Sequence, residues 1–182
     1  MSSKKYEILT KGETKIVNRK TLYRIRAIKD FGNVKVGDIG GWIEKEFNLS
    51  HEGTCWIYND AIVCEIARVS ENARVSGYAL VCENAQVSGN AIVGEYAIVY
   101  GVAIVSGSAI VNGNAIVNGN AIVSGNALVS EDAIVSGVAI VSEIAFLDGR
   151  PNRNNVIDQN DIIDLQIALG TANTIEEFCA MV

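Results

Sequence analysis

Histidine, the side chain best suited to acid–base and metal chemistry near neutral pH, occurs once in this chain of 182 residues. The single histidine, His51, lies in the segment LSHEGTCW and could act as a general base that takes a proton from a hydroxyl or an amine. The alternative is a structural role in which His51 bonds a turn, and the sequence favours it. One imidazole cannot build a histidine-rich zinc site, and the four cysteines, Cys55, Cys64, Cys82 and Cys179, lie at no metal-type spacing. The sequence therefore predicts no metal site.

Composition and motifs exclude several other kinds of site. The formal net charge of -6 and the lack of a Lys/Arg cluster on any periodic face argue against a nucleic-acid surface. No apolar run reaches about 18 residues and the first residues lack an apolar signal segment, so we expect no membrane span and a cytoplasmic location. The sequence also lacks a phosphate-binding loop, a dinucleotide-binding glycine signature and a nucleophile elbow.

A six-residue repeat occupies the middle of the chain and dictates its fold. In the unit AIVN at 115–118, the alternation of a strand points the alanine and valine to one face and the isoleucine and asparagine to the other. Gly119 and Asn120 then turn the chain, because glycine accepts a positive φ and asparagine tolerates it better than most residues. The same spacing continues from Ile57 to Leu147 without an insertion. Four strand residues and a two-residue bend, repeated in this way, predict a solenoid.

Residues 57–148 resemble the hexapeptide-repeat, left-handed parallel β-helix family. The motif of that family is an aliphatic residue, a small or acidic one, two variable ones, a small one and one more variable one. Three hexads make one triangular coil in the family, so the resemblance implies about five coils of about 18 residues here. It specifies the fold class, an all-β solenoid, and leaves the function open.

Both ends of the repeat carry segments that we expect to cap it. Residues 1–56 have the alternation and turn residues of a small β-rich cap. The stretches DFGNVKVGDIGGW at 30–42 and LSHEGTCWIYNDA at 49–61 resemble the entry segment of YdcK-type bacterial hexapeptide proteins, a group usually described as transferases. This second resemblance indicates relatives but no reaction.

The C-terminal segment, residues 149–182, is predicted to be a linker followed by a short pair of helices over the last coil. Asp158 suits the N-cap and Gly170 the end of the first helix, and Thr174 with Glu177 has capping-box spacing for the second. The alternative is a docking hairpin for a partner, and tails of this kind resemble those of bacteriophage proteins. The apolar residues that would dock are Ile162, Leu165, Leu169 and Phe178.

Outward side chains one coil apart are expected to stack into columns with a spacing of about 4.8 Å. Some columns are largely isoleucine, and a monomer would expose larger apolar patches than soluble proteins usually tolerate. We therefore expect further copies of the chain to cover them, and the resemblance favours a homotrimer with its helices side by side. The β-propensity of isoleucine is the alternative explanation. The predicted interface consists of Ile62, Leu80, Ile98, Ile116 and Ile134 in one column and Ile104, Ile122 and Ile140 in the second.

These observations favour a self-associating scaffold or binding protein that has no catalytic constellation and needs no cofactor. Two alternatives stay open. Many hexapeptide-repeat proteins are acyltransferases, and the resemblance then implies acetyl-CoA or another acyl-CoA as cofactor, with His51 as the base at an oligomer interface. The other alternative is an inhibitor or sequestering protein of phage or prophage origin that binds a host factor or a small molecule.

Overall fold

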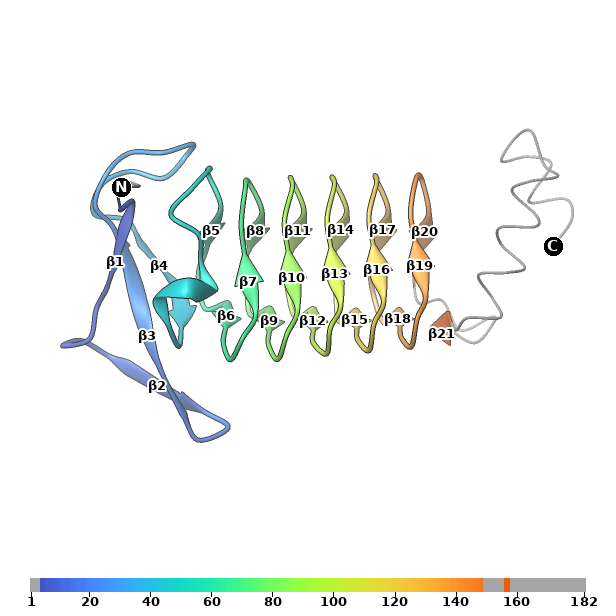
Figure 1. Cartoon of the computed structure of the whole chain (residues 1–182), viewed down its shortest axis with the longest axis horizontal. Helices are drawn as coiled ribbons and strands as arrows, with labels where there is room; N and C mark the ends of the chain where they lie inside the picture. The colour runs from blue at the N-terminus through green and yellow to red at the C-terminus, as the bar shows by residue number, and fades with distance from the viewer. Residues whose placement is uncertain (1–3, 149–155, 158–182) are drawn as a thin grey trace, which may run out of the picture.

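Short strands recur at every sixth residue in the computed structural model, which describes residues 4–148 and 156–157. In the repeat, each strand pairs in parallel with the strand three places further along the chain, so successive coils stack on one another, as Figure 1 shows. The all-β solenoid predicted from the repeat is thereby confirmed. Its left-handed sense stays a prediction.

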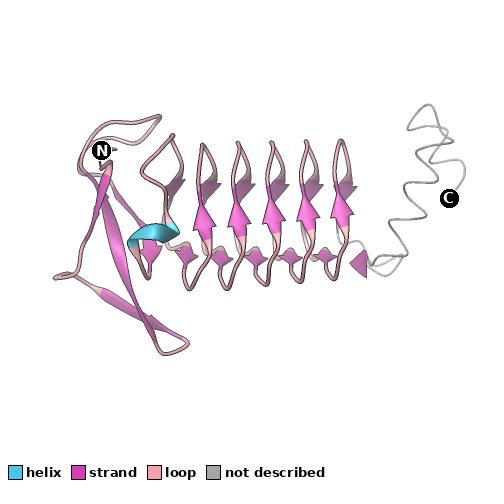
Figure 2. Ribbon diagram, in the orientation of Figure 1, coloured by secondary structure: helices cyan, strands magenta, loops and turns pink. Residues whose placement is uncertain are grey.

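Three sheets form the sides of the solenoid (Figure 2). The ten-stranded sheet contains β1 (Tyr6–Ile8), β2 (Thr14–Val17), β3 (Lys20–Ala27), β4 (Ile39–Ile43), β6 (Ile62–Val63), β9 (Leu80–Val81), β12 (Ile98–Val99), β15 (Ile116–Val117), β18 (Ile134–Val135) and β21 (Val156–Ile157). The five-stranded sheet contains β7 (Arg68–Val69), β10 (Gln86–Val87), β13 (Ile104–Val105), β16 (Ile122–Val123) and β19 (Ile140–Val141). The six-stranded sheet contains β5 (Trp56–Ile57), β8 (Arg74–Val75), β11 (Ile92–Val93), β14 (Ile110–Val111), β17 (Leu128–Val129) and β20 (Phe146–Leu147).

The alanine and the valine of each hexad fill the interior of the solenoid. Ala115 and Val117 are both 0% exposed, whereas Ile116 between them is partly exposed. The inward and outward faces predicted from the alternation are confirmed. Because burial of one such valine stabilises the fold by about 1.5–3 kcal/mol, the repeated valines are a main source of the core's stability.

The parallel stack extends beyond the regular repeat at both ends. β4 pairs in parallel with β6, and β21 pairs in parallel with β18. The chain therefore completes about six turns between β4 and β21 rather than the five expected. The expected number was too low because the sequence around these two strands does not follow the hexad pattern.

Antiparallel strands close the N-terminal end of the stack. β3 pairs with β4 along one edge and with β1 and β2 along the other (Figure 1). Leu22 of β3 packs with Trp42 and Ile62, so the β2–β3 hairpin covers the first rung of the ten-stranded sheet. This pairing satisfies the edge of β4, which would otherwise offer unpaired backbone groups to another chain.

The expected C-terminal helical pair falls in residues 149–182. Of that segment the structure describes only β21, so the helical pair lies outside the described residues.

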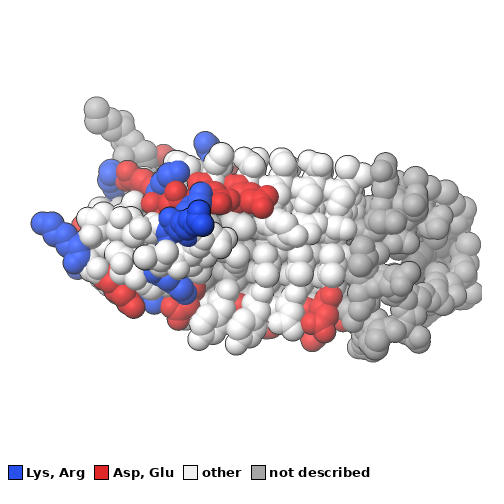
Figure 3. Space-filling model, turned by 90° about the horizontal axis from the view of Figure 1, so that it is seen from below, with Lys and Arg blue, Asp and Glu red and all other residues white. Residues whose placement is uncertain are grey.

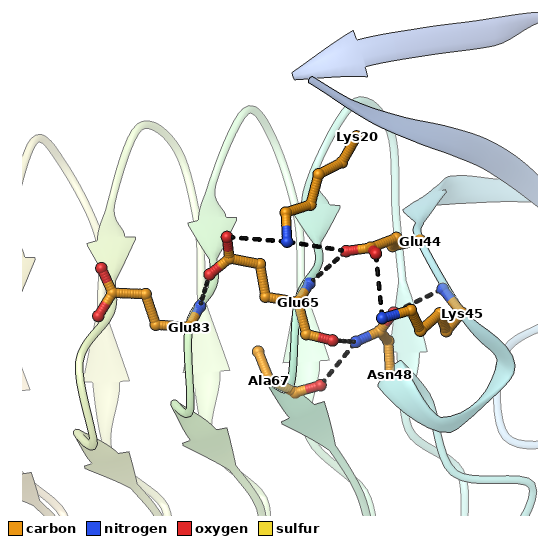
Figure 4. Close-up of polar contacts among 7 residues, drawn as sticks. All are labelled: Lys20, Glu44, Lys45, Asn48, Glu65, Ala67 and Glu83. Carbon is orange, nitrogen blue, oxygen red and sulfur yellow. Dashed lines mark hydrogen bonds and ion pairs between the residues drawn. The ribbon is translucent and has the colours of Figure 1, made fainter. Parts of the chain in front are cut away.

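Each corner of the regular coils places one residue in the left-handed region of φ, and from residue 65 onward that residue is a glycine or a glutamate. The angle φ is 68° at Gly119 and 58° at Glu83. A residue with a side chain adopts this conformation at a cost of roughly 1–2 kcal/mol. At Glu83 a hydrogen bond offsets the cost, because its Oε2 accepts the backbone N–H of Gly101 in the next coil at 3.0 Å. Glu65 accepts the backbone N–H of Glu83 in the same way at 2.9 Å (Figure 4).

Replacement of Glu83 tests this role of the corner carboxylate. Glu83→Ala should lower the free energy of unfolding by about 1 kcal/mol, because alanine keeps the unfavourable backbone angle and loses the hydrogen bond. Glu83→Gly should stay within about 0.5 kcal/mol of the original, because glycine adopts a positive φ without that cost. Urea titrations followed by circular dichroism would measure both. An equal loss in the two variants would contradict the explanation.

Candidate functional site

A groove of about 720 Å³ opens at the N-terminal end of the five-stranded sheet. One wall is the 3-10 turn η1 (Glu46–Asn48) with the segment that follows it to His51, and the other is the outward side of β7 and β10. Its volume lies in the range of small-molecule sites. Among the described residues it brings together the histidine singled out in the sequence and the first polar members of an outward column.

Asn48 fixes the turn η1 against the first regular coil. Its side chain is 0% exposed, and its amide Nδ2 donates to the backbone oxygens of Ala67 at 2.9 Å and Glu65 at 3.3 Å. Its Oδ1 accepts the backbone N–H of Lys45 at 2.7 Å (Figure 4). These three bonds use both N–H groups of the buried amide and one lone pair of its oxygen, so the wall of the groove is held rigidly.

Glu44 joins the cap to the corner column beside this turn. Its Oε2 accepts the backbone N–H of Glu65 at 2.8 Å, and the ammonium groups of Lys45 and Lys20 lie 3.1 and 3.9 Å from its oxygens (Figure 4). Burial raises the pKa of Glu44, but the backbone hydrogen bond and the two lysines outweigh it, so the pKa lies below its usual value. The carboxylate therefore stays charged and keeps the corner bond.

His51 has both ring nitrogens engaged inside the protein. Its Nδ1 accepts the backbone N–H of Lys5 at 3.3 Å, which leaves the proton on Nε2, 3.1 Å from Oε1 of Glu46. The ring also stacks on Tyr6 with a centroid distance of 4.3 Å. In this arrangement neither nitrogen is free to take a proton from a substrate, as the structural alternative expects.

A buried lysine lies behind His51, and nothing in the sequence pointed to it. Lys5 is 0% exposed, and its Nζ donates to the backbone oxygens of Glu52 at 3.2 Å and Gly53 at 3.3 Å and to Sγ of Cys55 at 3.2 Å. Burial lowers the pKa of Lys5, and the neighbouring thiol opposes that shift. The lysine fixes the loop that carries His51.

Arg68 and Gln86 form the polar floor of the groove. They are partners in the parallel pairing of β7 and β10, and both side chains are exposed. The guanidinium carbon of Arg68 lies 5.7 Å from the ring centroid of Phe47, which belongs to η1. Their place at the head of an otherwise apolar column was a visible sequence signal, whereas nothing in the sequence marked Phe47 as a neighbour of Arg68.

The residues of the predicted self-association interface stack as expected from their spacing. Ile98 pairs with Ile116 and Ile104 pairs with Ile122, and all four are partly exposed. Ile140 is 44% exposed. Leu80 and Ile134 continue the first column and are also partly exposed.

Ile62 differs from the rest of that predicted interface. It is 9% exposed because Leu22 and Trp42 of the cap pack on it. Ile62 therefore contributes little to the exposed surface. The predicted docking residues Ile162, Leu165, Leu169 and Phe178 lie outside the described residues.

The cysteines within the described ranges carry free thiols of low reactivity. Cys55, Cys64 and Cys82 form no disulfide with one another. Burial raises the pKa of Cys64 to about 12 and that of Cys82 to about 11, so both stay protonated at neutral pH.

The described part of the chain also gives no sign of a metal site. Residues 4–148 and 156–157 contain no group of three or more potential metal ligands. In the same part of the chain, no helix has the length and hydropathy of a membrane span.

The fold and the groove define a parallel β-solenoid with a polar site near its capped end. Residues 67–83, 85–101 and 123–137 match the family described as YdcK beta solenoid repeat. The chain is also 47% identical over 57 residues to the protein called "Uncharacterized acetyltransferase YdcK" of Escherichia coli (strain K12). That match covers 31% of this chain and 18% of the relative, so the chain spans less than a fifth of the relative's length. These three stretches of the repeat therefore match YdcK-type solenoid repeats, in agreement with the sequence resemblance.

Substitution of His51 tests its structural role. His51→Ala should lower the free energy of unfolding by about 1–3 kcal/mol, because it leaves the partly buried N–H of Lys5 without an acceptor and removes the ring from Tyr6. His51→Phe keeps the stacking and loses only the hydrogen bonds, so its loss should be smaller. Urea unfolding of the two variants measures the difference. Unchanged stability in both variants would show that these contacts do not hold the loop.

Proposed function

We propose that this chain is a scaffold or binding protein that associates with further copies of itself through the outward apolar columns of its solenoid. The observation that carries the proposal is the in-register stacking of partly exposed isoleucines, such as Ile98 on Ile116 and Ile104 on Ile122. Contiguous exposed apolar surface of this kind is typical of an interaction site. Flat, regular columns suit a second copy, which carries the same columns.

The distribution of charge supports the same proposal. No lysine or arginine occurs between residues 75 and 148. Figure 3 shows the charged side chains gathered over the cap and the first coils, while the later coils on that face are mostly uncharged. Interface cores are depleted of charged residues, so the later coils have the composition of a surface that is covered in an assembly.

The fold itself does not require isoleucine at these outward positions. Arg68, Gln86 and Arg74 occupy equivalent positions on the first coils and form the same parallel ladders. Polar and apolar side chains are therefore equally compatible with the backbone there. The choice of isoleucine on the later coils is better explained by contact with another molecule than by strand propensity alone.

Single charges on the columns test self-association. Ile116→Glu and Ile122→Glu should shift the purified protein toward the monomer, because a carboxylate buried in an apolar interface loses its hydration. Asn120→Glu adds the same charge at an exposed corner and should leave the assembly unchanged. Native mass spectrometry gives the copy number, and circular dichroism checks the fold. A monomeric wild-type protein, or two column variants that assemble normally, would contradict the proposal.

An acetyltransferase is the second candidate function. The observation that favours it is the name of the Escherichia coli relative, and His51 would have to give up its hydrogen bond with Lys5 to act as the base. If it holds, acetyl-CoA should be retained in native mass spectra and thiol release should be detectable with an amine acceptor. His51→Phe should then abolish release, whereas Arg74→Gln, outside the groove, should keep it. Self-association predicts no such release from the wild-type protein.

A further inference from the structure

The groove coincides with the place where an apolar column becomes polar. The outward column of the ten-stranded sheet begins with Ile62 and Leu80, whereas that of the five-stranded sheet begins with Arg68 and Gln86. Both polar side chains line the groove. Since isoleucine fits the same positions on later coils, the fold does not require the polar pair that lines the groove.

Arg68 brings an uncompensated positive charge to this site. Within the described part of the chain it makes no ion pair, and its recorded contact is with the Phe47 ring. The acid of the groove, Glu46, is already bound by the ammonium of Lys4 at 2.5 Å and lies 3.1 Å from Nε2 of His51. The guanidinium of Arg68 is therefore the positive charge in the groove that is available to bind an anion.

Hydrogen-bond donors surround Arg68 on a rigid surface. The amide of Gln86 stands one rung away, at about 4.8 Å along the ladder, and Ser70 projects from the same face two residues after Arg68. A guanidinium offers a planar fork of donors that matches a carboxylate, and the amide and hydroxyl add further donors. Arg68 and Gln86 lie on strands, which hold such groups more precisely than loops do.

An apolar wall adjoins these donors. The Phe47 ring is 43% exposed and lines the groove, whereas Leu49 and Val69, each 1% exposed, contribute almost no side-chain surface to it. A ligand that satisfies both parts combines an anionic group with a flat apolar body. We propose that this groove binds an aromatic carboxylate, with its carboxylate on Arg68, Gln86 and Ser70 and its ring against Phe47. This proposal stands independently of self-association.

Benzoate, titrated by calorimetry and by NMR of the arginine Nε–H signals, is the probe that tests the site. We expect the wild-type protein to bind benzoate with a shift of the Arg68 signal and to ignore benzamide, which has the same shape without the charge. Arg68→Gln should weaken binding by roughly 10- to 100-fold, since a hydrogen bond to a charged group contributes that much. Phe47→Ala should weaken binding less.

Arg74→Gln is the matched control, because Arg74 holds the equivalent outward position on the six-stranded sheet and does not line the groove. This variant should bind benzoate as the wild-type protein does. Three outcomes would overturn the proposal: no binding of benzoate by the wild-type protein, equal binding of benzamide, or an equal loss in Arg68→Gln and Arg74→Gln. Both arginines are exposed on folded coils, and circular dichroism of the two variants verifies that folding is intact.

Discussion

Main-chain hydrogen bonds between successive coils are the constraint on which the rest of this molecule depends. The N–H of Ile62 bonds to the oxygen of Ala79 at 2.9 Å, and that of Cys64 bonds to the oxygen of Val81 at 3.1 Å. The same pattern repeats along all three sides. Each two-residue strand is too short to be stable alone, so its pairing with the coils on either side supplies the stability, as in other solenoids. A sequence period thereby becomes a set of straight columns, and both the apolar surface and the groove are built from such columns.

The corners show how tightly the coils approach. A Cβ atom on Gly89 would lie 2.6 Å from the backbone oxygen of Gly107, and one on Gly101 would lie 2.7 Å from that of Gly119. Glycine stacked on glycine therefore brings backbone directly onto backbone. At Glu65 and Glu83 the side chain is accommodated and its carboxylate caps an N–H of the next coil. The two residue types solve the same steric problem by different means, one by absence of a side chain and the other by a compensating bond.

The sequence predicted the parts of the structure that follow from its six-residue repeat. The inward Ala and Val positions, the outward columns and the parallel stack all follow from a spacing of six. β4 was outside that prediction because IGGWI lacks the hexad pattern, although the strand pairs in parallel with β6. The contacts of His51 with Lys5 and of Asn48 with Ala67 connect segments far apart in the chain. A buried lysine such as Lys5 contradicts the usual preference of its type, so only the three-dimensional arrangement reveals it. In the sequence, Arg68 and Gln86 stand out as the two polar residues of an otherwise apolar column. The turn η1 that faces them and completes the groove could not be predicted, because its neighbours are far away in the sequence.

The register of the ladder also makes the length of this molecule adjustable. The groove is complete by Gln86, and the later coils repeat one pattern without touching it. Duplication or deletion of one whole coil in that later part would move the far end by about 4.8 Å and leave every remaining pair in register. A change of any other size would rotate the columns out of line. The later part of the solenoid thus resembles a ruler with fixed divisions, whose reach evolution can alter by tandem duplication while the capped end stays the same.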